Sequence, residues 1–518
     1  MQKTTWTLSR FVALVAALLC LYFIADFSLQ GSGFVKDPNL LEILAFAITI
    51  IVLNSSKKLF WFLLFPALLL HAFYTPVGLS VGAPNYAYIA SVFASDLSES
   101  KEFLAQLSVK HISIAISIII LLILFRKISI KFNFQFYRNK TLMALGLICL
   151  LFSASPARLF TATYTATQQV FTELKQLNQL QQESEWGKSE LTHSKYDDYV
   201  LIIGESARRD YHHAYGYPIE NTPFMSSSNG VLVDGLNSAG RNTISSLRLM
   251  LTLPFTEKWE PNYALTLVDL IKSAGLKTYW LSVQGQLGAY DTPISSIGKK
   301  SDETRFLRAG DSFSSDISDF SLLPEFQRVI NQPHQGKRFI VLHLYGSHPG
   351  ACERVKDYPL IYPQDQIPNR FEEVNCYISS IKKTDDFLRQ VYEMLQQNQQ
   401  KNDRTFSMLY FSDHGLVHQD EGNKIVINNS IDSVFMYDIP LFKVSSDDRE
   451  RKVYKTMKSG LNFTNGIANW VGISNAKLNP NLDLFNGKSD NNGYGLAAIL
   501  RSIENPPDPA VVIPLKKH

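Results

Sequence analysis

The chain has 518 residues, of which 46% are hydrophobic, and a formal net charge of +3 at neutral pH. This length exceeds that of one average domain, so we expect at least two structural parts. The positive charge is too small to indicate a nucleic-acid partner.

Residues 1–156 are the most apolar part of the sequence and predict a membrane domain. Five apolar segments lie there: 11–25, 40–53, 59–73, 112–125 and 142–152. Most are short for a bilayer span of about 20 residues, and each alone could be a buried core helix. Lysine and arginine, however, gather before the first segment, between the second and third, and between the fourth and fifth. This alternation predicts a bundle of five transmembrane helices with a cytoplasmic N-terminus and an external C-terminal part.

The first apolar segment could instead be a cleaved signal peptide. Its apolar run continues past Cys20 to Ala25 without a clear cleavage site, and further apolar segments follow, so we expect it to be retained. Cys20 and Cys149 fall inside predicted spans, where we expect them to pack as inert side chains. Cys352 and Cys376 fall in the external part, where an oxidising compartment permits a disulfide; two free thiols are the alternative.

Residues 157–197 form the predicted connection between the two parts. Apolar side chains recur at roughly helical spacing between Phe160 and Leu180. This pattern predicts an amphipathic linker helix lying along the bilayer surface. A plain exposed linker helix fits the same pattern.

Residues 198–518 predict an α/β domain, because short apolar runs alternate with longer helical patterns. The predicted strands are 199–203, 278–283, 339–344 and 406–411. The predicted helices include 265–274 and 376–395. This alternation predicts a doubly wound parallel sheet.

Acidic and imidazole side chains follow two of these predicted strands. Glu205 lies in the sequence GES directly after the first strand, and Asp413 and His414 lie in the sequence SDHG at the end of strand 406–411. Open α/β sheets bind ligands at the carboxyl ends of their strands. The two strand ends therefore predict a metal site in one crevice.

Thr243 is predicted to lie at the start of a helix, because the apolar run 244–252 follows it and Pro254 ends that run. Unpaired N–H groups and the positive end of the helix dipole favour an alkoxide and an incoming phosphate there. Threonine is also an ordinary N-cap residue. Its proximity in the predicted fold to Glu205 and to the 413–414 pair favours the role of nucleophile.

The five spans, the GES strand end, the threonine at a helix start, and the sequences HLYGSHP and SDHG together resemble the phosphoethanolamine transferases of Gram-negative envelopes, in the alkaline phosphatase and sulfatase superfamily. The loop 74–104 resembles the branch that modifies the lipopolysaccharide core. The resemblance implies a bacterial inner-membrane protein with an alkaline-phosphatase-like catalytic domain in the periplasm. It also implies one zinc ion, which would activate the threonine hydroxyl. The implied zinc ligands are Glu205, Thr243, Asp413 and His414.

The resemblance also implies residues that contact the substrate. In the family, the second histidine of the HLYGSHP turn lies beside the bound phosphoryl group or a second metal, a role implied for His348, whereas His343 is expected to be structural. His418 is either a substrate contact or a surface residue. The other candidate phosphate contacts are Gln284, Arg241 and Asn242. For these three, a solvated position in a loop or at a helix end is the alternative.

Two features depart from the branch of the family that modifies lipid A. That branch has a later histidine beyond DHG, which this chain lacks in 423–428, and it has cysteines where this chain has Ala239 and Leu249. The presence of a second metal and the number of disulfides therefore stay open.

The implied reaction is a two-step transfer. Thr243 attacks the phosphorus of phosphatidylethanolamine, diacylglycerol leaves, and an envelope glycolipid, either lipopolysaccharide core or lipid A, accepts phosphoethanolamine from the phosphothreonine. A sulfatase is disfavoured because Thr243 stands where a cysteine or serine would be needed and the proline of the CxPxR motif is missing. A phosphoglycerol transferase or phosphodiesterase of the same superfamily, and a non-enzymatic membrane sensor on a degenerate fold, are the alternatives.

Overall fold

The computed structural model describes residues 8–94, 100–101, 103–104, 107–152, 155–179, 184–284, 292–307, 317–490 and 492–516. Part of the loop 74–104, whose sequence resembles the core-modifying branch, lies outside these ranges. The chain divides into two compact units. One unit comprises Met1–Phe93 and Phe103–Phe171, and the other comprises Ala94–Glu102 and Thr172–His518.

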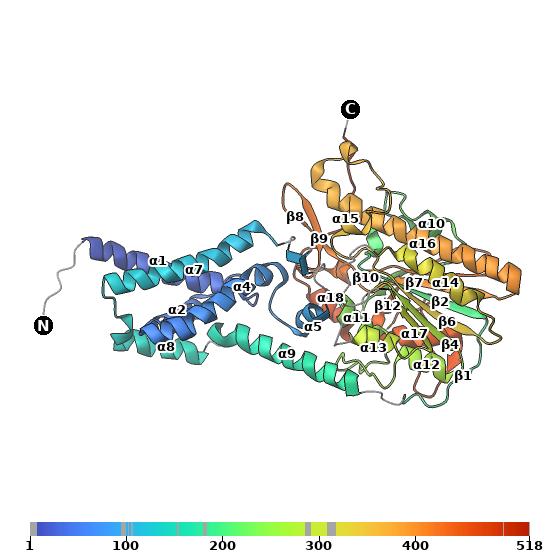
Figure 1. Cartoon of the computed structure of the whole chain (residues 1–518), viewed down its shortest axis with the longest axis horizontal. Coiled ribbons are helices and arrows are strands. Elements are labelled where there is room, and N and C mark those ends of the chain that lie inside the picture. The colour runs from blue at the N-terminus through green and yellow to red at the C-terminus, as the bar shows by residue number, and fades with distance from the viewer. Residues whose placement is uncertain are drawn as a thin grey trace. The chain divides into compact units, whose positions relative to one another are not determined.

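The first unit is built from apolar helices, drawn in blue to blue-green in Figure 1. The helices are α1 (Leu8–Gly31), α2 (Leu40–Leu53), α3 (Lys57–Leu59), α4 (Phe65–Val81), α5 (Tyr86–Ala94), α7 (Val109–Lys131), α8 (Lys140–Phe152) and most of α9 (Ser155–Gln179). A π-helical turn, Phe60–Leu64, joins α3 to α4 without a break. Glycines let α1 and α4 approach closely: a Cβ added at Gly78 would lie 2.0 Å from the carbonyl oxygen of Gly31.

Among the described residues, three helical stretches are long and apolar enough to cross a membrane. They are Leu8–Gly31, Lys57–Val81 and Val109–Lys131. The other two predicted spans correspond to α2 and α8, which are apolar but only 14 and 13 residues long. At a rise of 1.5 Å per residue each covers about 20 Å, which is less than the hydrocarbon core of about 30 Å.

The second unit contains a nine-stranded sheet in the order β10-β3-β11-β7-β2-β6-β4-β5, with β12 beside β3. The strands are β2 (Asp198–Gly204), β3 (Val231–Asn237), β4 (Lys277–Ser282), β5 (Glu303–Phe306), β6 (Arg338–His343), β7 (Phe406–Ser412), β10 (Asp438–Ile439), β11 (Leu441–Ser445) and β12 (Lys452–Ser459). The four predicted strands are β2, β4, β6 and β7, which pair in parallel. Outside the sheet, β8 (Val417–Asp420) pairs with β9 (Ile425–Asn428), and β1 (Glu190–Leu191) pairs with β13 (Ile473–Ser474).

The sheet is mixed rather than wholly parallel, which corrects the predicted topology. β11 runs antiparallel to both β7 and β3. The stretch between β7 and β11 is described throughout and contains no α-helix. Because a parallel connection needs a crossover of a dozen or more residues, usually through a helix, a return without one favours the antiparallel direction.

Helices cover both faces of the sheet (Figure 1). They are α10 (Pro223–Ser227), α11 (Thr243–Met250), α12 (Leu267–Ser273), α13 (Pro293–Gly298), α14 (Leu322–Asn331), α15 (Ala351–Arg354), α16 (Glu372–Asn402), α17 (Phe463–Val471) and α18 (Leu496–Ser502). Alternate residues of β2 enter two cores: Leu201 packs with α12 and α17, and Ile202 packs with α14 and α16. The sheet is therefore doubly covered, as the buried apolar strands predict.

The predicted linker 157–197 is helical only in its first part. α9 ends at Gln179, and β1 is already paired with β13. Trp186 is 3% exposed in the core of the second unit and donates its indole N–H to the carbonyl of Thr266 at 2.8 Å. Residues 184–197 thus belong structurally to the α/β unit, because their apolar side chains complete its core.

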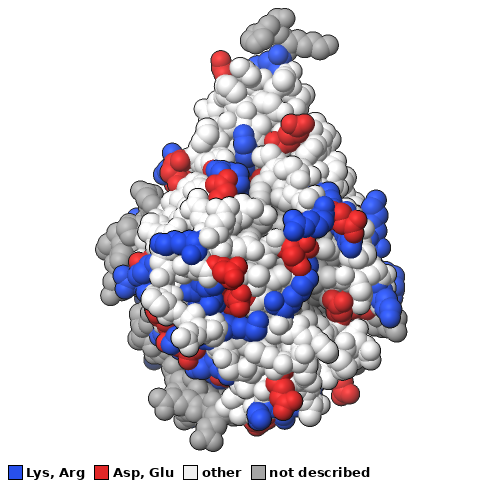
Figure 2. Space-filling view, turned by 90° about the vertical axis from the view of Figure 1, so that its right-hand side faces the viewer, with Lys and Arg blue, Asp and Glu red and all other residues white. Residues whose placement is uncertain are grey.

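Ion pairs occur both on the surface and in the interior of the second unit. Lysine and arginine are interspersed with aspartate and glutamate on the face shown in Figure 2, and exposed pairs of this kind stabilise a fold little. At the amino ends of the central strands, by contrast, Arg338 binds fully buried Asp198 with two hydrogen bonds of 2.7 and 2.8 Å. Arg404 adds a third cationic contact at 2.7 Å. This cluster lies at the end of the strands opposite to the predicted site.

Candidate metal centre

The register of β2 and β7 brings the two predicted ligand turns together. Gly204 on β2 pairs with Ser412 on β7, the last residues of the two parallel strands. Glu205 therefore leaves the sheet beside Asp413, whose N–H donates to the carbonyl of Gly204 at 3.1 Å. This juxtaposition is the one expected from the two strand-end sequences.

Thr243 is the first residue of α11 and points its hydroxyl at these turns. The preceding Asn242 is the N-cap, and its side chain accepts a hydrogen bond of 2.9 Å from the N–H of Ser245. Oγ1 of Thr243 lies 3.0 Å from Oε2 of Glu205 and 3.4 Å from Nε2 of His414. The cap thus fixes the start of the helix where the hydroxyl meets two candidate ligands.

Three buried residues form a cluster of metal-ligating type: Glu205, Asp413 and His414, with ligand atoms within 4.8 Å of one another. Oδ1 of Asp413 accepts N–H hydrogen bonds from Ser206 and His414, at 2.9 and 2.7 Å. Its other oxygen, Oδ2, is buried and has no hydrogen bond within the described part of the chain. Nδ1 of His414 donates to the carbonyl of Gly415, so Nε2 is left to face the carboxylates. Two carboxylates, a hydroxyl and an imidazole fit a tetrahedral zinc ion.

Without a cation, the cluster holds protons on Asp413 and His414 at neutral pH. Burial and, to a smaller extent, the negative charge of Glu205 raise the pKa of Asp413 to about 8. Burial opposes the charging of His414, but the carboxylates of Asp413 and Glu205 raise its pKa to about 9. Burial also disfavours ionised Glu205, yet the hydrogen bond and charge of His414 keep the pKa of Glu205 below its usual range. A divalent cation would allow both carboxylates to ionise.

Ser206 is a site residue that sequence reasoning missed. Its φ of 58° lies in the left-handed region, which a non-glycine residue rarely adopts, and such strained backbone collects at functional sites. Its hydroxyl donates to Oε1 of Glu205 at 2.7 Å. Gly346 packs on the same turn: its φ is 46°, and a Cβ there would lie 2.9 Å from the N atom of Glu205. The HLYGSHP turn thus supports the Glu205 turn directly.

Gln284 contacts a candidate ligand. Its Nε2 donates to Oε2 of Glu205 and to the carbonyl of Leu344, both at 2.9 Å. The predicted phosphate contact is therefore seen as a partner of Glu205. His343 is 4% exposed, and burial lowers its pKa to about 4, so it is a neutral interior side chain.

The remaining predicted residues surround the cluster at different positions. The ring of His348 stacks on Tyr345 with centroids 4.8 Å apart. The proximity of His348 also contributes to the lowered pKa of Glu205. Arg241 forms an ion pair with Asp432. Its guanidinium is thus directed to a carboxylate in this structure.

His418 lies in an interior network beside the second ligand turn. Its Nδ1 is 3.2 Å from Nη1 of Arg208 and 3.3 Å from the hydroxyl of Tyr211. The side chain is 11% exposed. His418 is therefore mostly enclosed rather than a surface histidine.

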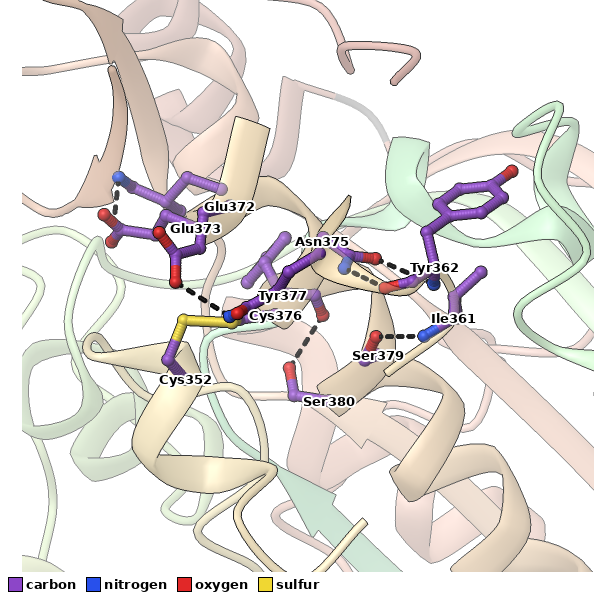
Figure 3. Close-up of a disulfide and its surroundings, with 12 residues drawn as sticks. Cys352, Ile361, Tyr362, Glu372, Glu373, Asn375, Cys376, Tyr377, Ser379 and Ser380 are labelled. Atoms are coloured by element: carbon purple, nitrogen blue, oxygen red, sulfur yellow. Dashed lines mark hydrogen bonds between the residues drawn. A yellow bond between two sulfur atoms is a disulfide. The ribbon is translucent and has the colours of Figure 1, made fainter. Parts of the chain in front are cut away.

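Cys352 and Cys376 form a disulfide that joins α15 to α16 (Figure 3). Cys352 lies three residues after Pro349, the last residue of the HLYGSHP turn. Ser380 on α16 is labelled in Figure 3. Its hydroxyl donates to that of Ser347 within the turn at 2.8 Å. α16 thus anchors the turn that carries His348 by one covalent and one polar contact.

Comparisons with known proteins identify the family. A model of the sulfatase family matches residues 197–473. A candidate phosphoethanolamine transferase of Haemophilus influenzae is 53% identical over 445 residues, which cover 86% of this chain and 92% of that protein. The chain belongs to the phosphoethanolamine transferase family. The family inferred from the motifs is confirmed, and the phosphoethanolamine transferase OpgE of Escherichia coli is a further relative, 38% identical over 55% of this chain and 52% of OpgE.

Solved structures agree with the fold of this family member. The integral membrane protein EptA, a lipooligosaccharide phosphoethanolamine transferase of Neisseria meningitidis, has a TM-score of 0.57 at 15% identity over 92% of this chain and 97% of EptA. The C-terminal periplasmic domain of Escherichia coli EptC, in complex with Zn, has a TM-score of 0.50 at 22% identity over 59% of this chain and 90% of that domain. These likenesses show the fold: apolar helices followed by a mixed α/β domain.

Proposed function

We propose that this family member transfers phosphoethanolamine from phosphatidylethanolamine to an envelope glycolipid, with Thr243 as the nucleophile. The position of the Thr243 hydroxyl carries the proposal. It lies at a helix N-terminus, 3.0 Å from Glu205 and 3.4 Å from His414, beside the buried oxygen of Asp413 that has no hydrogen bond in the described part of the chain.

The residues that would hold one zinc ion are Glu205, Thr243, Asp413 and His414. The oxygen and nitrogen donors suit zinc, and the relative EptC binds Zn in its periplasmic domain. Bound zinc supplies a positive charge that stabilises the threonine alkoxide and the charge on the phosphoryl oxygens.

Thr243 performs the first chemical step. Its Oγ1 forms a bond to phosphorus and loses its proton while the bond to the diacylglycerol oxygen breaks and that oxygen gains a proton. The products are a phosphothreonine that carries the ethanolamine group and free diacylglycerol. Glu205 orients the hydroxyl through its contact with Oγ1. The first N–H groups of α11 face the phosphoryl oxygens, and His348 approaches them from the HLYGSHP turn. In the second step a hydroxyl or phosphate of the acceptor attacks the same phosphorus and releases Thr243.

The apolar unit would keep the active site near its lipid donor. The proposed organisation is a transmembrane domain in 1–156, a linker in 157–197 and a periplasmic catalytic domain in 198–518. The bundle has five spans in this proposal, including short α2 and α8, whose apolar residues contribute to one core with α1 and α7. The charge distribution of the loops supports an inner-membrane protein with the catalytic part in the periplasm.

The acceptor in this proposal is lipopolysaccharide core or lipid A. Mass spectrometry of envelope glycolipids from cells with and without the gene tests it: a phosphoethanolamine increment that disappears with the gene is expected. Purified protein incubated with labelled phosphatidylethanolamine or phosphatidylglycerol separates the donors. Transfer from phosphatidylglycerol alone would make the protein a phosphoglycerol transferase.

A further inference from the structure

We propose that residues 503–516, which follow α18, hold the turns of the metal centre in position. We call this segment the clasp, and we propose that Asp508 is its positioning residue. This inference rests on the proposed function, because it concerns the same site. The segment contains neither helix nor strand. Its contacts nevertheless reach the two stretches of chain that carry the candidate ligands, and also Asp432, the ion-pair partner of Arg241 near the nucleophile.

The carboxylate of Asp508 joins separate turns. Its Oδ2 accepts hydrogen bonds of 2.9 Å from Nη1 of Arg208 and from the backbone N–H of His418. Its Oδ1 accepts a hydrogen bond from the hydroxyl of Ser433. Arg208 follows the first ligand turn and His418 follows the second, so one carboxylate holds the ends of both turns.

Arg208 connects Asp508 to the turn that holds the candidate ligand His414. Its guanidinium is fully buried and binds Asp210 with hydrogen bonds of 2.9 and 2.7 Å. Gly415 packs on its stem, since a Cβ at Gly415 would lie 2.9 Å from Cγ of Arg208. The carbonyl of Gly415 accepts the hydrogen bond that orients the ring of His414. A displacement of Arg208 would therefore change the orientation of the His414 ring.

A second contact of the clasp supports the start of α11 indirectly, through Asp432 and Arg241. Nδ2 of Asn505 donates to the carbonyl of Asp432 at 2.8 Å. The carboxylate of Asp432 pairs with Arg241, two residues before Thr243. The clasp thus contacts supports of the Glu205 turn, the His414 turn and the start of α11.

The segment is also attached by contacts that do not involve Asp508. The N–H of Ala510 donates to Oδ2 of Asp210 at 2.8 Å, and that of Val511 donates to the hydroxyl of Tyr211 at 3.1 Å. Ile513 is buried in the core beneath. A change at Asp508 alone should therefore leave the segment attached while it removes one of the two carboxylate charges that order Arg208.

The test compares Asp508→Asn with Asp198→Asn in the full-length protein. Both residues are carboxylates paired with a fully buried arginine, but Asp198 lies at the far end of the sheet. Zinc affinity is measured by competition with a chelator, and Tm, kcat and KM with phosphatidylethanolamine vesicles are measured alongside. Asp508→Asn should weaken zinc binding and should lower kcat more than it raises KM. The loss of zinc affinity should be smaller than the roughly tenfold to hundredfold loss caused by removing a direct partner of a metal ligand, because Asp508 acts through Arg208. Asp198→Asn should lower Tm and leave zinc affinity unchanged.

Unchanged zinc affinity in Asp508→Asn would overturn the proposal, as would an equal loss in Asp198→Asn. Asp508→Glu, which keeps the charge, should recover part of the zinc affinity. If Asp508→Asn does not fold, Ser433→Ala removes only one hydrogen bond from the same carboxylate and should weaken zinc binding in the same direction; no effect there would also count against the clasp. The zinc measurement uses no lipid, so an error in the proposed donor would leave it intact.

Discussion

Ser206 and Asp413 join the two ligand turns directly, because the backbone N–H of Ser206 donates to Oδ1 of Asp413 at 2.9 Å. The bond occupies one carboxylate oxygen and leaves Oδ2 facing the cluster. A strained residue of the first turn thereby orients a ligand of the second. The candidate metal centre is therefore organised by its own backbone before any ion binds.

Thr243→Ala should abolish transfer, because the attacking oxygen is lost. With donor lipid and no acceptor, the wild-type protein should gain phosphoethanolamine on the peptide spanning 242–248, detected as a mass shift. Thr243→Ser should retain some activity because the hydroxyl remains. A label on Ser245 or Ser246, or wild-type turnover in Thr243→Ala, would show that another residue is the nucleophile.

Zinc affinity should rise with pH. Without the ion, raised pKa values of about 8 for Asp413 and about 9 for His414 mean that both groups hold a proton at neutral pH. Zinc must displace these protons, so its affinity should increase from about pH 6 and level off above about pH 9. Calorimetry in buffers of different ionisation enthalpy should show proton release at neutral pH. A pH-independent affinity over this range would contradict the ligand set.

Gln284→Ala should weaken zinc binding by about tenfold, because it removes a hydrogen bond that orients Glu205. The zinc dissociation constant and KM for the donor lipid are measured together, because they distinguish the two possible roles of Gln284. If Gln284 instead contacts the phosphate, KM should rise while the zinc dissociation constant stays at the wild-type value. That result would restore the role predicted from its loop position.

A fragment of residues 172–518 should fold and hydrolyse small soluble phosphodiesters, since it contains the whole nine-stranded sheet and all of the second unit except Ala94–Glu102. It should fail to take phosphoethanolamine from vesicles because it lacks the membrane unit. A shorter fragment that begins at Tyr199 should be less stable, since it lacks Trp186 and Tyr196 of the core. Undiminished transfer from vesicles by the longer fragment would show that the apolar unit is dispensable for donor access.

The central strands could be predicted from sequence because burial on both faces leaves a continuous apolar run. β2, β4, β6 and β7 lie within one residue of the predicted ranges at each end. The direction of β11 could not be predicted in this way, since it depends on pairing with β3 and β7. Local apolar patterns do not record which distant strand is the neighbour.

The candidate metal centre shows the same limit. Glu205 and the Asp413-His414 pair were identifiable because they follow recognisable strands. Gln284 has no local signal for its role, since an amide in a loop can bond to water, phosphate or a ligand equally well. Asp508 has still less local signal in the sequence, because its partner Arg208 is 300 residues away.

The separation between Arg208 and Asp508 has a consequence for when the site can form. A chain exported from its amino end presents Glu205 and Thr243 to the periplasm well before residue 508 arrives. Until then, the turns that carry the candidate ligands lack one of the supports that join them. In the proposed clasp, the candidate metal centre therefore reaches its final geometry only after nearly the whole α/β unit has crossed the membrane, which places its maturation on the periplasmic side.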